Sequence, residues 1–164
     1  MNTHVAVLGA HGGAGVSTLV ELLLLAGVPA VEPELGEHLP ANALPALVAR
    51  STASGMTAAA TLLAQWHPDV PLPFLVINAD VPAPPPPPVR YRLRVVKGMA
   101  RATVDVPFLW PLRAVDHVDE VAGAKPVART IQRLAAAFNA SVQTRGVDVD
   151  YAMAGYETNH GESA

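Results

Sequence analysis

Residues 5–18 read VAVLGAHGGAGVST, and this stretch decides the fold. Its first part, Val5–Leu8, is a short apolar run of the kind that forms a buried strand. Glycines at positions 12, 13 and 15 follow, and the apolar segment Ser17–Ala26 then predicts a helix that ends at the next glycine. A strand, a glycine loop and a helix in this order are typical of the beginning of a parallel α/β domain.

The rest of the chain alternates between strand-like and helical stretches. Short apolar runs predict three further strands, at Ala46–Ala49, Phe74–Ile77 and Val104–Leu109. Apolar residues at helical spacing predict three further helices, over residues 51–66, 89–100 and 126–142. We expect Pro107 to place the last strand at a sheet edge or to end it early. Residues 28–43 contain three prolines and no clean period, so we expect a connector there.

Two stretches allow two interpretations. Residues 89–100 alternate like a strand, but their apolar residues also form a helical stripe, and we favour the helix. The proline run at residues 82–88 is either a docking peptide for an aromatic groove or a stiff spacer between a strand and the next helix, and we favour the spacer. With these choices, the sequence predicts a three-layer α/β fold, with a mostly parallel sheet of about four strands and helices on its faces.

Length and composition bound the domain organisation. The 164 residues suit one domain, and 51% hydrophobic residues against 15% charged residues supply a core. We assign residues 1–145 to a single α/β domain. Residues 146–164 contain four acidic residues and no Lys or Arg, so we expect an acidic, flexible tail there.

Composition also excludes several classes of protein. The net charge of −3 gives no global reason to bind nucleic acid or an anionic membrane. The chain has no cysteine, which excludes disulfides, thiol catalysis and thiolate metal sites. The most apolar stretch, residues 18–31, contains Glu21 and Pro29 and falls short of the roughly 18 to 20 apolar residues that cross a bilayer. The N-terminus lacks the pattern of a signal peptide, so we expect a cytoplasmic protein without membrane insertion.

The glycine loop has the frame of a phosphate-binding loop. Glycines let backbone N–H groups converge on an anion, and the helix that follows points its positive end at the same place. A working loop adds a lysine for the outer phosphates and a hydroxyl for magnesium. In this chain Val16 occupies the lysine position, whereas Ser17 keeps the hydroxyl. The predicted phosphate-binding residues are His11, Gly12, Gly13, Ala14, Gly15, Val16, Ser17 and Thr18. His11 either faces the anion or is a solvated loop residue.

The segment HGGAGVST, residues 11–18, resembles the deviant Walker A motif of the MinD/ParA group of P-loop ATPases, whose pattern is Lys-Gly-Gly-x-Gly-Lys-Ser/Thr. In this register the two lysines of the motif fall on His11 and Val16. Three later segments are similar to successive parts of the family. Residues 47–51 and the following helix resemble the strand and helix after the Walker B region. Residues 74–78 resemble a strand whose Asn reads adenine. Residues 106–111 and 125–138 resemble the closing strand, its proline-containing loop (Pro107 or Pro111) and the last helix.

The resemblance implies a reduced P-loop NTPase-like domain that binds ATP or GTP with Mg²⁺. It further implies that Asn78 binds the base and that Ser17 is a metal ligand when a Mg-nucleotide is bound. The GAHGGAG loop is also similar to that of a small family of P-loop-like proteins from high-GC bacteria. That similarity implies an accessory role in a conjugation- or secretion-type assembly.

The carboxylates needed for hydrolysis are missing from the pattern. In MinD/ParA proteins the catalytic and Walker B aspartates lie in a long stretch for which this chain has only the proline-broken connector. The acids of the connector, Glu32, Glu34 and Glu37, follow no apolar run. We therefore assign no catalytic residue and expect any nucleotide to bind weakly.

Other polar residues support weaker hypotheses. The six histidines show no metal-ligand spacing, and residues 116–120 are best explained as a charged turn before a helix. Arg90, Arg94, Lys97 and Arg101 share one face of the helix expected at residues 89–100. That face could contact nucleic-acid phosphates or an acidic partner, but we favour a solvated face.

Two functions remain. We favour a non-catalytic P-loop-like interaction or scaffold module that binds a protein partner and requires no cofactor. The alternative is a nucleotide-binding switch or weak NTPase of the MinD/ParA type, which holds ATP or GTP through backbone amides and the hydroxyls of Ser17 and Thr18.

Overall fold

The computed structural model describes residues 4–34, 37–39 and 42–158, which form an α/β fold around a parallel sheet. The five strands of the described chain are β1 (Val5–Gly9), β2 (Ala30–Val31), β3 (Leu44–Arg50), β4 (Phe74–Asn78) and β5 (Ala102–Val106). The α-helices are α1 (Val16–Leu25), α2 (Ala53–Ala64), α3 (Pro87–Met99) and α4 (Lys125–Thr158), and two short 3-10 helices, η1 (Trp110–Ala114) and η2 (Val118–Val121), precede α4.

All strand pairs are parallel, in the order β2-β1-β3-β4-β5. This is one of the common orders of doubly wound α/β sheets, in which the chain winds in opposite directions from the boundary between β1 and β3. Loops that follow the strands on either side of such a boundary diverge and leave a crevice at the carboxyl ends of the strands. The glycine loop follows β1 and therefore lies at this crevice.

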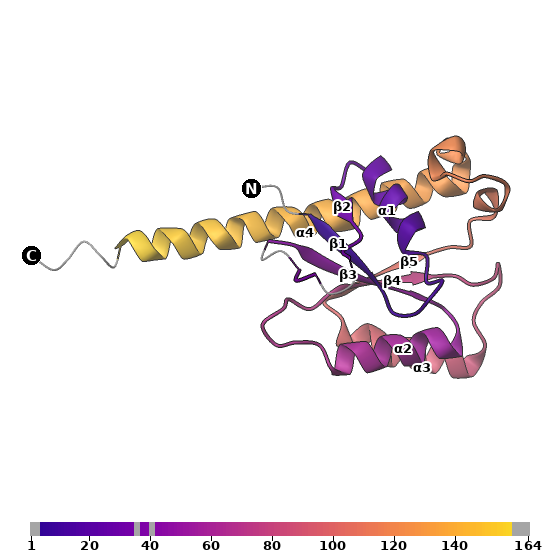
Figure 1. Cartoon of the computed structure of the whole chain (residues 1–164), viewed down its shortest axis with the longest axis horizontal. Coiled ribbons are helices and arrows are strands. Elements are labelled where there is room, and N and C mark those ends of the chain that lie inside the picture. Colours follow the sequence, from indigo (N-terminus) through magenta and orange to yellow (C-terminus); the bar gives the residue numbers. More distant parts are fainter. Residues whose placement is uncertain (1–3, 35–36, 40–41, 159–164) are drawn as a thin grey trace, which may run out of the picture.

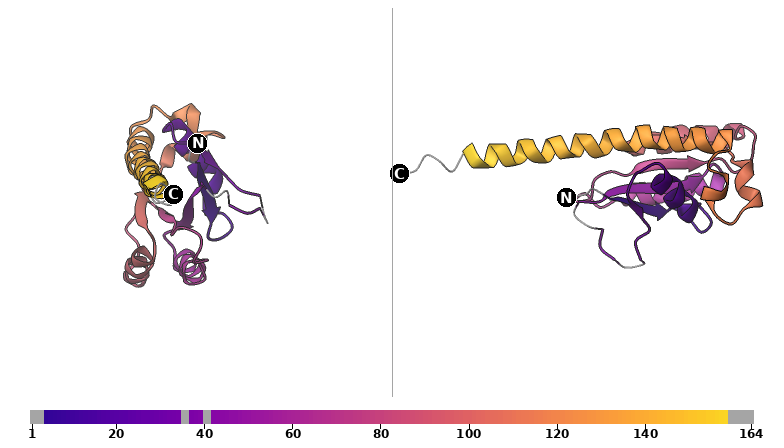
Figure 2. Two further views of the ribbon diagram at one scale, coloured as in Figure 1. Left: turned by 90° about the vertical axis from the view of Figure 1, so that its left-hand side faces the viewer. Right: turned by 90° about the horizontal axis from the view of Figure 1, so that it is seen from above.

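Helices cover both faces of the sheet (Figures 1 and 2). One core lies between the sheet, α1 and α4, and the other lies between the sheet, α2 and α3. The strand residues alternate between the two cores: Val48 and Val76 belong to the first, whereas Leu47 and Leu75 belong to the second. This period of two explains why the central strands read as continuous apolar runs, since both of their faces are buried. The predicted three-layer fold is confirmed.

The sheet has five strands where we expected about four, because β2 lies inside the stretch that we expected to be a connector. Its two residues, Ala30 and Val31, pair with Val5 and Ala6 of β1. The N–H of Val5 also donates to the carbonyl of Pro29, at 2.8 Å. A strand of two residues after a proline leaves no run in which a period could be recognised.

The choice of a helix at the first ambiguous stretch agrees with the structure. Residues 89–100 lie almost entirely in α3, with Val89 and Val96 buried against α2 and the sheet. The proline run joins β4 to α3, and Pro87 occupies the first helical position, where its missing N–H costs nothing. The edge strand β5 ends at Val106, directly before Pro107, because proline has no N–H to donate to a ladder.

Helix α4 extends well beyond the sheet (Figures 1 and 2). It runs through Thr158 and so includes residues 146–158 of the expected tail, whereas residues 159–164 lie outside the described residues. Val127, Leu134 and Phe138, near its start, are fully buried. No helix in the described part of the chain combines the length and the hydrophobicity needed to cross a bilayer.

Candidate functional site

The glycine loop connects β1 to α1 in the conformation that its glycines permit. Gly13 and Gly15 have φ values of 73° and 99°, in the left-handed region that side chains disfavour. Gly15 is the N-cap of α1, and its carbonyl accepts the first helical bond, from Leu19 at 3.0 Å. The first amides of α1 therefore lie at the loop, as in helix-terminal anion sites.

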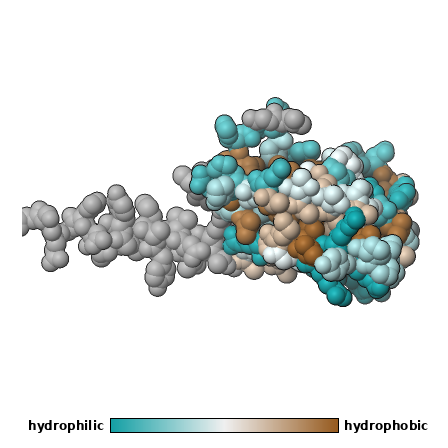
Figure 3. All heavy atoms as spheres, turned by 90° about the horizontal axis from the view of Figure 1, so that it is seen from below, coloured by the Kyte–Doolittle hydropathy of each residue, from teal (hydrophilic) through white to brown (hydrophobic). Residues whose placement is uncertain are grey.

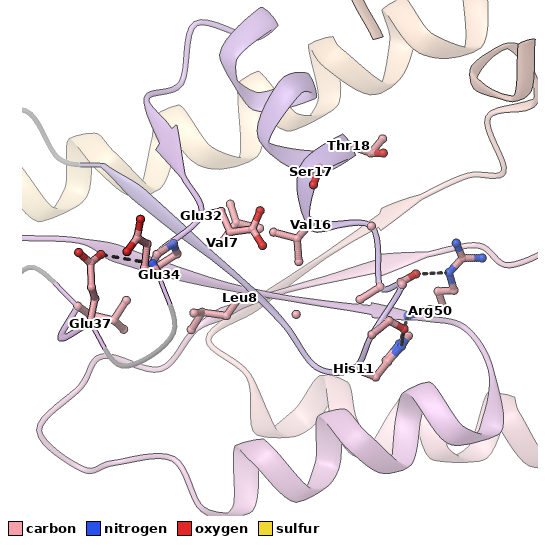
Figure 4. A pocket seen from close by; sticks show the side chains of 17 residues that line it. Val7, Leu8, His11, Val16, Ser17, Thr18, Glu32, Glu34, Glu37 and Arg50 are labelled. Atoms are coloured by element: carbon pink, nitrogen blue, oxygen red, sulfur yellow. Dashed lines mark hydrogen bonds between the residues drawn. The ribbon is translucent and has the colours of Figure 1, made fainter. Parts of the chain in front are cut away.

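A pocket of about 840 Å³ opens beside the loop (Figure 4). The structure brings all eight predicted phosphate-binding residues, at positions 11–18, to its wall. The opposite side of the pocket carries Glu32, Glu34 and Glu37, and Arg50 completes the set of charged residues. The sequence therefore predicted the residues that form the loop side of this pocket.

His11 contacts its own loop and the neighbouring strand. Its Nε2 accepts a hydrogen bond from the backbone N–H of Arg50, at 3.1 Å, and its Nδ1 lies 2.9 Å from the carbonyl oxygen of Gly12. Because a backbone N–H can only donate, these contacts indicate the neutral ring with its proton on Nδ1. Both ring nitrogens are therefore bonded to the protein backbone instead of facing an anion.

Arg50, the last residue of β3, is a charged residue of this pocket that the sequence analysis did not single out. Its Nε donates to the carbonyl of Gly13 at 2.6 Å, and its Nη1 forms an ion pair with Asp80 at 3.0 Å. The guanidinium thus ties the glycine loop to β3 and to the residues after β4. A signal was present, since a charged residue directly after an apolar strand lies at the edge where α/β proteins bind ligands.

Asn78, the predicted base-binding residue, also contacts the loop. Its Nδ2 donates to the carbonyl of Ala14 at 2.9 Å. It lines a second, smaller pocket of about 140 Å³ on the β5 side of the loop, together with Pro107 and Phe108. Pro111 is buried in η1, so Pro107 is the proline of the closing segment that lies beside Asn78. Base binding by Asn78 stays a prediction.

The structure corrects the expectation for the acids of the connector. Glu32 directly follows β2, a strand that pairs with β1, and it lines the same pocket as Ser17 and Thr18. We had expected these acids to follow no apolar run, and the two-residue strand before Glu32 is too short to be recognised as one. Even so, no group of three or more His, Asp or Glu residues in the described chain is arranged to hold a metal ion.

A third pocket, of about 440 Å³, lies between α3, β5 and α4. Arg90, Arg94 and Lys97 of the predicted basic face line it, whereas Arg101 does not. Arg133 of α4 completes the charged wall, and no pattern on α3 could have revealed it. We call this pocket the basic groove.

Searches of protein-family models, of curated proteins and of solved structures found no match to this chain.

Proposed function

We propose that this protein is a non-catalytic interaction module in which the glycine loop is a structural element. The observation that carries the proposal is that the polar groups around the loop are bonded to the loop itself. Arg50 binds the carbonyl of Gly13, Asn78 binds the carbonyl of Ala14, and both nitrogens of His11 contact backbone groups. These bonds stabilise the loop through groups of the protein itself.

The charge of the pocket supports the same proposal. Three carboxylates and one guanidinium line it, and that guanidinium is already paired with Asp80. Val16 lines the pocket at the position where a phosphate-binding loop has its lysine. A nucleoside triphosphate would bring several further negative charges next to the glutamates, and like charges in a partly enclosed site repel. The residues present therefore do not fit a triphosphate.

The second candidate function is a switch that binds ATP or GTP weakly with Mg²⁺. One observation favours it, namely that Glu32 lies at a strand end on the same pocket as the hydroxyl of Ser17. A carboxylate and a hydroxyl are suitable oxygen ligands for magnesium. The experiment below separates the two functions.

We expect the unmodified protein to bind ATP with a Kd of about 1 mM or weaker in the presence of magnesium, and to show no hydrolysis above a blank. Val16→Lys should tighten ATP binding about 10-fold, because it restores a charge-assisted phosphate contact worth about 1.5 kcal/mol. Hydrolysis should stay absent, since we assign to no carboxylate of the pocket the role of activating water. Isothermal titration calorimetry and a phosphate-release assay measure both quantities.

Val95→Lys is the matched control, because it adds the same charge at an exposed position on α3, away from the glycine loop. It should leave ATP binding unchanged. Micromolar binding by the unmodified protein would establish the switch instead of the structural loop. Magnesium-dependent turnover that disappears in Ser17→Ala would contradict the non-catalytic proposal outright.

A further inference from the structure

The basic groove is built by α3, by the strand β5 that follows it directly, and by α4, which lies further along the chain. Its cationic side chains are Arg90, Arg94 and Lys97 of α3 and Arg133 of α4. Asp105 of the edge strand β5 is the acidic residue among the lining residues. Four cations against one carboxylate give this groove a strong positive charge on a protein whose net charge is −3.

Two of the cations hold the groove together. Lys97 forms an ion pair with the carboxylate of Asp105 at 2.9 Å, which joins α3 to β5. Arg133 donates through Nη1 to the carbonyl oxygen of Asp105 at 3.2 Å, which joins α4 to the same point of β5. Asp105 is therefore already occupied, and its charge is balanced within the groove.

The other two cations have no such role. Arg90 and Arg94 are exposed, and within the described part of the chain neither guanidinium has an ion pair or a hydrogen bond. Arg92, between them, differs: it donates to the carbonyl of Ala53 and to the hydroxyl of Thr57, and so joins α3 to α2. Two arginines on one wall of a groove are thus available for an external anion.

Most of the other residues that line the groove are apolar. Leu93 of α3, Ile77 of β4 and Val106 of β5 line it, and Ile77 and Val106 belong to the buried core. Ala83 and Pro85 of the proline run form another part of the wall, and a proline-rich segment loses little conformational freedom on binding. The neighbouring surface of α2 and α3 mixes hydrophobic and hydrophilic residues (Figure 3).

We infer that the basic groove is the docking site of the interaction module and that it binds an acidic segment of a partner protein, in which apolar side chains alternate with carboxylates. The inference rests on the proposed function and names its partner by chemistry. Carboxylates would pair with Arg90 and Arg94, since arginine binds carboxylates in a bidentate manner. The apolar side chains would contact Leu93, Ala83 and Pro85, apolar lining residues that are not buried.

Nucleic acid fits the groove less well. None of the side chains that line it in the described chain is aromatic, so the groove offers no ring on which a base could stack. The apolar part of the groove also has no counterpart on a sugar-phosphate chain.

Fluorescence anisotropy on the full chain tests the inference, with a labelled peptide that alternates Glu with Leu as the probe. We expect this peptide to bind, to bind more weakly as salt is raised, and to lose at least about 10-fold in affinity in the double variant Arg90→Gln, Arg94→Gln. The matched control is Arg101→Gln, Arg129→Gln, which removes the same charge from residues that do not line the groove. The control should bind as the unmodified protein does, and circular dichroism checks that both variants fold.

Three results would overturn the inference. They are no binding of the Glu–Leu peptide, an equal loss in both double variants, and tighter binding of an oligo(dT) strand that is lost in Arg90→Gln, Arg94→Gln. None of them depends on nucleotide binding, since no described residue lines both the basic groove and the pocket of the glycine loop. Failure here is therefore distinguishable from failure of the non-catalytic proposal, which the ATP experiments test.

Discussion

Gly15→Ala is expected to lower the free energy of unfolding by about 2–3 kcal/mol. The residue has a φ of 99°, and placing alanine in the left-handed region costs about 1–2 kcal/mol. Its new Cβ would also lie 2.5 Å from Nδ2 of Asn78, which now donates to the carbonyl of Ala14. Displacing Asn78 loses that hydrogen bond, worth about 1 kcal/mol. Urea unfolding measures the sum.

The neighbouring glycines provide matched controls for the two causes. A Cβ on Gly12 or Gly13 meets no atom within 4 Å, and only Gly13 has a positive φ, of 73°. Gly12→Ala should therefore change stability by less than about 0.5 kcal/mol, and Gly13→Ala should cost about 1–2 kcal/mol. In an Asn78→Ala background, the extra cost of Gly15→Ala should fall to that of Gly13→Ala. Equal losses at positions 12 and 15 would contradict the described loop.

Phe138→Ala is expected to have the largest effect on stability, about 3–5 kcal/mol. The side chain is fully buried between α4 and the sheet, and its ring lies 4.6 Å from the ring of Phe74, centroid to centroid. Truncation removes this aromatic contact and leaves a cavity in the core beneath α1 and α4. Chemical unfolding followed by circular dichroism gives the loss.

Trp110→Ala is the matched control. Trp110 is also an aromatic residue, but it lies in η1 and is 67% exposed. It should change stability by no more than about 0.5–1 kcal/mol, because most of its ring already contacts water. A small loss in Phe138→Ala, similar to that of the control, would show that α4 does not close this face of the sheet. Such a result would also contradict the position of Arg133, a residue of α4, in the wall of the basic groove.

At the candidate site, the sequence predicts the glycine loop itself but not the side chains that bind it. A loop of this kind is local: its glycines, the strand before it and the helix after it lie within about twenty residues, so their order alone predicts the arrangement. The partners of the loop are not local. Arg50 and Asn78 come from strands that lie 37 and 64 residues further along the chain from the loop atoms they bind. Sequence order does not indicate which side chains end beside the loop.

The sequence by itself determined the elements that show a hydrophobic pattern of their own or that end at a proline or glycine. These are the apolar runs of β1, β3 and β4, the helical segments of α1, α2 and α3, the first turns of α4, and the end of β5 before Pro107. Strand order, the short strand β2, the bonds of His11 and Arg50, and the meeting of Arg133 with α3 were decided only by the tertiary structure. The physical reason is that a helix or a buried strand is specified by interactions between near neighbours and by hydrophobic spacing. The sites at the carboxyl ends of the strands and at the edge of the sheet arise instead where separate elements pack together, and single side chains from each element complete them.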